Sequence, residues 1–534
     1  MNDQTKSEPS IWERTTTRRF LRWLFTWRGI RRVLIVLAWA VTIVGLFYGE
    51  ENWRGRRAWN QYREAAEARG VSFDSATYIP KPAPDEQNFA ATPFLKTFFQ
   101  PNDNGFILTN DLWYRASDNI AGTNLVKEKG RRHFTDLVAW QLAAAALQSG
   151  ALKRGQEFET DYTGLDARAA AAPVVLEGMK PDAAVFAELR AASTRPYSRY
   201  PVVYDLENPW KIMLPHLAQV KVACQHLNLE ACAELAAGQS DQALADVKLM
   251  LSLADSIKSE PFIISFLVRV ACVQIAIQPV WEGLAEHGWT DAQLQELQAR
   301  FLSYDFLADM EPPLQLERAE GVRLADVVQK IGLGVLAELA KGLRQSYTPD
   351  EQLPLYLLGR VIPSGWYYQE KLNFSKLFDA QMDGVVDAAA KRVSPRKAAV
   401  NLQLCGRAWG QGTSRVILRH CVIAKIRLPA LAIVPMRAAA AKTAADQAAL
   451  ACALERYRLA NGQFPETLAA LTPRFISRAP NDVITGQPYK YRRADDGQFI
   501  LYSVGWNEKD DGGVPGKTLF DQTQGDWVWS YPAR

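Results

Sequence analysis

Histidine and cysteine are scarce in this sequence: five histidines and six cysteines are spread over 534 residues. No two histidines lie four residues apart, the spacing that places two metal ligands on one face of a helix. The cysteines are scattered and form neither a zinc-binding pattern nor a disulfide framework. The sequence therefore indicates no zinc site, and we expect the cysteines to be buried as small apolar side chains.

The motifs of serine hydrolases and nucleotide-binding proteins are missing as well. No Gly-x-Ser-x-Gly elbow occurs, and residues 512–518 are one residue short of a phosphate-binding loop and lack its strand–loop–helix context. The net charge of +4 is small for the length, and most of the excess lies near the N-terminus. We therefore expect neither a nucleotide nor a nucleic acid as a partner.

Charge is absent from one long apolar run, Val33 to Gly49. A helix of this length spans about 25 Å, close to the roughly 30 Å of a bilayer hydrocarbon core. The run ends in Tyr48-Gly49-Glu50-Glu51, which is a poor cleavage site for a signal peptidase. We therefore predict a retained transmembrane helix at 33–49 rather than a cleaved signal peptide.

The residues before this run, 1–32, form a basic tail. Between Lys6 and Arg32 there are eight basic residues against two acids, whereas two glutamates follow the run directly. This bias predicts that the tail is cytoplasmic and that the rest of the chain lies across the membrane, although three arginines at 54–57 reduce the contrast. Residues 17–22 also resemble a twin-arginine export signal.

A second apolar stretch, Phe262 to Val280, contains Arg269 near its middle. An arginine at the centre of a membrane span costs several kcal/mol. We therefore predict a buried core helix here, and a single span in the chain as a whole.

Residues 50–134 are expected to form a juxtamembrane helix and a proline-rich loop region, and residues 135–400 a helical body. Within the body, two runs with apolar residues at near-helical spacing, 227–235 and 243–254, are separated by Gly238. They predict an αα-hairpin that resembles one tetratricopeptide repeat, so a helical bundle and a short α-solenoid both remain open. Thr290 is expected to cap the helix that follows.

Three glycines between residues 401 and 427 indicate a linker, and a different kind of sequence follows at 428–534. An alanine-rich stretch predicts a long helix that begins after Pro435, because proline is poorly tolerated inside a helix. The runs Tyr489–Arg492 and Phe499–Val504 predict strands. The expected fold is therefore mainly α, with one N-terminal transmembrane helix and a small C-terminal α+β domain.

The segment from Ala449 to Trp529 carries several motifs in a fixed order. They are Ala453–Arg458, Asn461-Gly462-Gln463-Phe464-Pro465, Pro480-Asn481-Asp482, Gly486–Tyr489, Tyr502–Asn507 and Asp510–Gly513. This series resembles the C-terminal domain of the major pseudopilin of type II secretion systems. The resemblance implies a helix packed on a small antiparallel sheet. The pseudopilin leader site is missing, so we expect no filament subunit, and the whole chain is similar to large membrane-anchored bacterial proteins with this ending.

In the pseudopilin family an acidic loop of this domain binds calcium. By position, the resemblance implies Asn507, Asp510, Asp511 and Asp526 as the ligands in this chain. Carboxylates and backbone carbonyls are the oxygen ligands that calcium prefers, but Asn507 stands where the family has an acid. The alternative is a solvated β-turn in which these side chains hydrogen-bond their own backbone.

These features predict a non-enzymatic protein in the inner membrane of a bacterium, with its bulk in the periplasm and with protein partners in the envelope, which the resemblance links to secretion-type machinery. One alternative is an extracytoplasmic hydrolase that uses an acid pair of the helical body, such as Asp305 with Asp309 or Asp379 with Asp383. Another is a solenoid-type peptide-binding module. A cleft that holds two acids of raised pKa would favour the hydrolase, and an open edge strand in the last domain would favour interaction.

Overall fold

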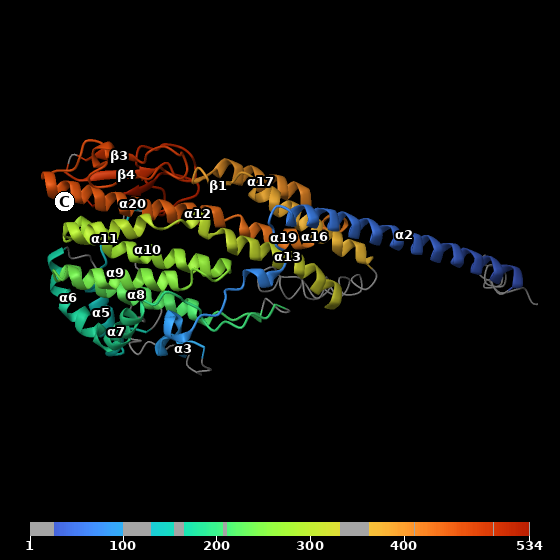
Figure 1. Ribbon diagram of the computed structural model, residues 1–534, viewed down its shortest axis with the longest axis horizontal. Helices are drawn as coiled ribbons and strands as arrows, with labels where there is room; N and C mark the ends of the chain where they lie inside the picture. Colours follow the sequence, from blue (N-terminus) through green and yellow to red (C-terminus); the bar gives the residue numbers. More distant parts are fainter. Residues whose placement is uncertain are drawn as a thin grey trace, which may run out of the picture.

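The computed structural model describes residues 26–99, 130–153, 165–206, 211–331, 362–410, 412–494 and 496–532. Over these residues the chain is mainly helical, with two small antiparallel sheets. One long helix runs out from an elongated body of packed helices, and the larger sheet lies on one side of that body (Figure 1).

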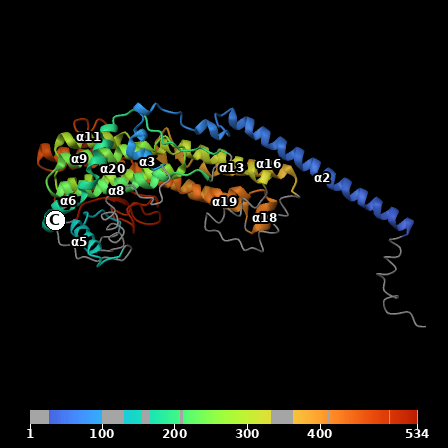
Figure 2. The ribbon, with the colours of Figure 1, turned by 90° about the horizontal axis from the view of Figure 1, so that it is seen from below.

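The projecting helix is α2 (Trp27–Glu67). The Thr26 side chain caps its start by accepting from the backbone N–H of Gly29 at 3.1 Å. The apolar segment of this helix is long enough to cross a membrane and is not buried by the body. The second half packs on the body, so the predicted juxtamembrane helix continues the predicted span without a break (Figure 2). Nothing interrupts the helix because no proline lies between the two halves.

Helices α8 (Pro215–Ala236), α9 (Ser240–Ser256) and α10 (Ile263–Ala285) form the centre of the body. The first two are the predicted hairpin, and α10 contains the second apolar stretch, more than half of which is buried. Each of the three helices contacts the other two. Helix α20 (Val434–Asn461), which is distant in the chain, also packs on α10. Such a contact is typical of a bundle, since the units of a solenoid contact only their neighbours along the stack.

Further helices surround this centre: α3 (Pro93–Thr97), α5 (Leu137–Gln148), α6 (Leu165–Met179), α7 (Ala183–Ala192), α11 (Asp291–Leu302), α12 (Phe306–Asp309), α13 (Glu311–Ile331) and α16 (Ser364–Met382). Short 3-10 turns lie in the described part of the proline-rich region, at 75–78, 85–87 and 89–91. Thr290 caps α11 in a complete capping box with Gln293, as predicted.

The predicted linker at 401–427 is wrong, because helices cover most of it: α17 (Pro395–Trp409), α18 (Thr413–Leu418) and α19 (Val422–Leu431). Gly406 lies inside α17. Of the three glycines, Gly410 and Gly412, with φ of 79° and 84°, interrupt the helical conformation. Packing explains the difference, since α19 contacts α13, α16 and α17. Three glycines in a short stretch therefore marked one turn rather than a linker.

The long alanine-rich helix is α20 (Val434–Asn461), with Pro435 in its first turn and Gly462 in a left-handed conformation at its end. From Val434 to Glu455, every residue except Arg437 is buried. One side of α20 contacts α10, α11 and α12, and strand β4 (Phe499–Ser503) packs on it as well. Residues 428–534 therefore share one hydrophobic core with the body instead of forming a separate core of their own.

The larger sheet has the strand order β3-β4-β5, all antiparallel, with β3 (Lys490–Arg493) and β5 (Trp527–Trp529) on either side of β4. The register pairs Tyr491 with Leu501, and Leu501 with Trp529. The first two strands agree with the prediction, whereas β5 was not expected. A second small sheet, β1 (Val386–Asp387) with β2 (Arg392–Val393), is also new.

Candidate functional site

The four residues expected to bind calcium lie between β4 and β5, and three of them meet at one turn. Asn507 donates from its side-chain amide to Asp511 at 3.2 Å. The backbone N–H groups of Asp511 and Gly513 donate to the two carboxylate oxygens of Asp526, at 3.2 and 2.6 Å. Asp510 turns toward the sheet instead, where its carboxylate accepts from the Tyr502 hydroxyl at 3.2 Å.

Two acids of this loop have basic partners, one in the loop and one in β3. Asp511 pairs with Lys509 at 3.2 Å, and Asp510 pairs with Lys490 at 3.4 Å. Asp526 is almost fully buried, and burial raises the pKa of its carboxyl group while the two N–H donors lower it. The N–H and ammonium donors around these carboxylates therefore fit the hydrogen-bonded turn. Calcium binding at this loop stays a prediction.

A second group of acids lies in the centre of the helical bundle. Glu230 and Glu234 occupy successive turns of α8, and Asp246 faces them from α9. Among the described residues this is the only group of three histidine, cysteine, aspartate or glutamate side chains whose ligand atoms all lie within 4.8 Å of one another. Asp246 is fully buried and Glu234 is 7% exposed. Arg190 of α7 reaches the group and pairs with Asp246.

Two of these carboxyl groups, those of Glu230 and Glu234, are expected to hold protons at neutral pH. Burial raises the pKa of Glu234 to about 9 and that of Glu230 to about 8, and the charge of Asp246 adds to both shifts. Burial also raises the pKa of Asp246, to about 6, although Arg190 opposes this shift. The side chains of Glu234 and Asp246 hydrogen-bond each other. In each of the three carboxyl groups, one buried oxygen accepts no further hydrogen bond from a described residue. Bound protons supply the donors that these buried oxygens need.

Replacing Glu234 by glutamine should raise stability at alkaline pH. A carboxyl group whose pKa is higher in the folded state destabilises the fold as the pH rises from about 4.5 toward that pKa. We expect the free energy of unfolding of the wild type to fall between pH 5 and pH 9, and that of Glu234→Gln to fall less, with a gain on the order of 2 kcal/mol at pH 8. Denaturant unfolding at three pH values measures this.

The control is Glu177→Gln, because Glu177 is 69% exposed in its pair with Lys180. This variant should follow the wild type at every pH, since exposed ion pairs contribute little. Equal pH dependence in the wild type and in Glu234→Gln would contradict the protonated state of the group.

The acid group was missed from the sequence although a signal was present. His226, Glu230 and Glu234 lie at intervals of four on a helix that is otherwise largely apolar on its buried side. His226 itself is 4% exposed and contacts Asp182 at 3.0 Å, as expected for a core histidine with a partner.

Three of the four acids named in the hydrolase alternative, Asp305, Asp309 and Asp379, have structural partners. Asp309 pairs with the buried Arg269 at 2.7 Å, and Asp379 pairs with the buried Arg318 at 2.7 Å. Asp305 caps α12 by accepting from the backbone N–H of Ala308 at 3.2 Å. These carboxylates are therefore engaged in holding helices together rather than free to act on a substrate.

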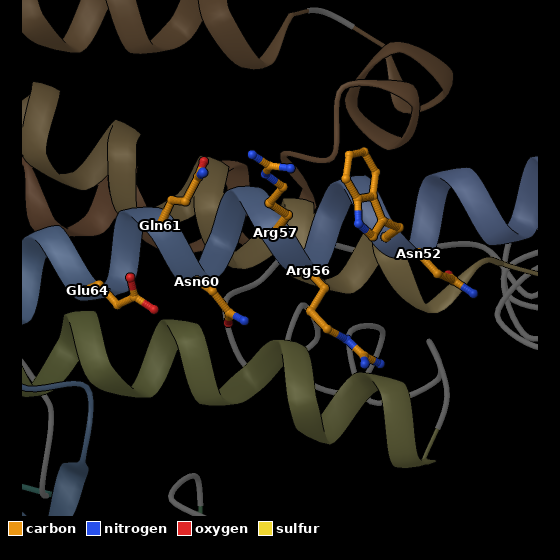
Figure 3. A pocket seen from close by; sticks show the side chains of 7 residues that line it. Asn52, Arg56, Arg57, Asn60, Gln61 and Glu64 are labelled. Carbon is orange, nitrogen blue, oxygen red and sulfur yellow. The ribbon is translucent and has the colours of Figure 1, made fainter.

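Two of the pockets lined by described residues are large enough for a small ligand, and neither contains the acid group of α8 and α9. One has a volume of about 340 Å³ and lies between α20, the β1–β2 turn and residues 478–483; the buried pair of Lys442 and Asp446 forms part of its wall. The other has a volume of about 560 Å³ and lies along α2, where it is lined by Asn52, Trp53, Arg56, Arg57, Asn60, Gln61 and Glu64 (Figure 3).

The α2 pocket lies beside the crossing of α2 with α16, since Asn52 and Arg56 of its lining contact α16. At the crossing, Gly55 of α2 meets Gly365 of α16 so closely that a methyl group on Gly55 would lie 2.2 Å from the carbonyl oxygen of Gly365. Asn52 accepts from the backbone N–H of Gly365 at 2.7 Å and so caps the start of α16. Glu51, which is buried, accepts from the Gln369 side chain at 3.0 Å. The crossing joins α2 firmly to the body.

Comparison of the chain with protein-family models, with curated proteins and with solved structures found no match. Neither an activity nor a ligand is therefore suggested by a relative. The features that bear on function are the exposed apolar half of α2, its crossing with α16, the buried acids and the two pockets.

Proposed function

We propose that this protein is a non-enzymatic component of the bacterial envelope, anchored in the inner membrane by α2, with its helical body outside the cytoplasm. One observation carries this proposal: α2 is exposed over an uncharged apolar segment and is then, without interruption, packed into the body. A contiguous apolar surface of this kind is unfavourable in water and marks contact with lipid or with another protein. A bilayer covers all sides of the helix at once.

The sheet of the last hundred residues supports an interaction role. Strand β3 pairs with β4 on one side only, so its other edge is an edge of the described sheet. An edge strand offers backbone N–H and C=O groups to a partner strand. We propose that this pseudopilin-like part binds a protein of secretion-type machinery through this edge, because α20 covers the opposite side of the domain.

Topology in cells tests the proposal, and the buried cysteines make the measurement simple. All six native cysteines are free and buried, so an impermeant maleimide should not label the wild type. We expect this reagent to label Glu466→Cys in intact spheroplasts, because Glu466 is 81% exposed. Ser7→Cys should be labelled only after lysis.

Fractionation completes this test. The protein should stay in the membrane pellet after an alkaline carbonate wash, which removes peripheral proteins. Labelling of Ser7→Cys in intact spheroplasts, or release of the wild type by carbonate, would contradict the proposed anchor and its orientation.

A further inference from the structure

Two arginines of α2 have no acidic partner. Arg54 pairs with Glu50 and Glu51, whereas neither Arg56 nor Arg57 forms an ion pair with a described residue. Instead, both guanidinium groups lie over aromatic rings: Arg57 lies 5.3 Å from the ring centre of Trp53, and Arg56 lies 5.6 Å from that of Tyr368. Stacking of this kind holds a guanidinium group in place while its N–H donors remain free.

Both arginines line the α2 pocket defined above. Figure 3 shows them leaving the helix to either side, with Asn60 and Gln61 one turn further along. The pocket therefore offers two cations that pair with no acid of the described residues, together with neutral amide groups. Its one acid, Glu64, lies seven residues beyond Arg57, which is about 10 Å along a helix. Glu64 is thus too distant to neutralise the two arginines.

The height of this pocket follows from the continuity of α2. Trp53 and Arg57 lie four and eight residues beyond Gly49, about 6 and 12 Å along the helix. The apolar run is slightly shorter than the hydrocarbon core, and the headgroup layer adds about 5–7 Å on each side. Trp53, which is 62% exposed, lies where tryptophan is enriched, at the boundary with water. The backbone of Arg56 and Arg57 therefore lies just beyond the headgroup layer, and their long side chains are able to snorkel back to the lipid phosphates.

We propose that the α2 pocket binds the headgroup of an anionic phospholipid of the leaflet on the body's side, with Arg56 and Arg57 donating to its phosphate. The inference rests on the proposed membrane anchor. Guanidinium groups suit phosphate because their planar donors match its oxygens. The site also accounts for arginines on the side of the membrane where basic residues are less common. The height of the pocket, next to the headgroup layer, favours a lipid. A soluble phosphate would reach every part of the protein surface equally.

Lipid retention tests this proposal on the full-length protein. The protein is purified in detergent with equal amounts of phosphatidylglycerol and phosphatidylcholine, and the lipids that remain bound are counted by native mass spectrometry. The wild type should retain phosphatidylglycerol in preference. Arg56→Gln and Arg57→Gln should each reduce this preference about fivefold, in line with the contribution of one basic residue at an anionic surface.

The control is the double variant Arg63→Gln, Arg69→Gln, which removes two charges, one more than either test variant, from residues that are ion-paired and exposed. It should keep the wild-type preference. Equal retention of the two lipids by the wild type would overturn the proposal, as would equal loss in the control. Release of the lipid by millimolar glycerol phosphate would assign the site to a soluble phosphate. Extraction of the wild type by carbonate would refute the anchor itself, independently of lipid preference.

Discussion

Gly365→Ala is expected to separate α2 from the body. A methyl group on Gly365 would lie 2.0 Å from the carbonyl oxygen of Glu51 and 2.4 Å from its carbon. Both are backbone atoms, so no side-chain rotation relieves the overlap. The helices must move apart, which also breaks the cap that Asn52 provides to α16. We expect a loss of about 3 kcal/mol, at the upper end of what overpacking costs.

Thermal unfolding of the full-length protein in detergent measures this loss, and limited trypsin digestion detects the detached helix by faster cleavage after Arg63 or Arg69. Gly49→Ala, on the same helix, and Gly406→Ala, inside α17, are the controls because nothing lies within 4 Å of either added methyl group. Alanine at such helical positions should be neutral or stabilising by up to about 1 kcal/mol. Unchanged stability and digestion of Gly365→Ala would contradict the close crossing.

Arg168→Met should destabilise the body by about 3–5 kcal/mol, the cost of leaving one partner of a buried ion pair uncompensated. The Arg168 side chain is 2% exposed and pairs with Glu282, which is fully buried, and with Glu286 at 3.2 Å. Its remaining donors reach the backbone carbonyl oxygens of Thr135 at 3.3 Å and Cys232 at 3.1 Å. One guanidinium group thus joins α6, α8, α10 and the segment before α5.

The double variant Arg168→Met, Glu282→Gln separates loss of charge from loss of contacts. If the unpaired charge of Glu282 causes most of the loss in the free energy of unfolding, the double variant should be more stable than Arg168→Met alone. Arg63→Met serves as the control, because Arg63 is 45% exposed in its pair with Glu67 and should change stability by less than about 0.5 kcal/mol. Midpoints of denaturant unfolding give all three values. A loss below 1 kcal/mol for Arg168→Met would contradict this role.

Features encoded by neighbouring residues were predictable from the sequence. The uncharged run at 33–49, the turn at Gly238, the cap at Thr290 and the strands near 490 and 500 all follow from local composition and periodicity. The burial of the six cysteines was likewise expected and is confirmed.

Features that depend on distant residues were not predictable. The meeting of Gly55 with Gly365 joins positions about three hundred residues apart, and each glycine alone looks like an ordinary helical residue. The acid group combines α8 with α9 and α7, so its raised pKa values arise only when the helices assemble. The short strand β5 is held by tertiary contacts as well: the Gln447 side chain donates to the carbonyl oxygen of Trp527 at 2.7 Å.

The central position of α20 also has a consequence for biosynthesis. The faces of α10 and α11 that α20 covers are made long before residues 434–461 are added. At translation rates of about 5–20 residues per second, the 176 residues from the end of α10 at 285 to the end of α20 at 461 take at least about 9 s. During this interval the core of the nascent chain is unfinished. In the proposed topology, export would require a chaperone or translocase that shields these faces until synthesis is nearly complete.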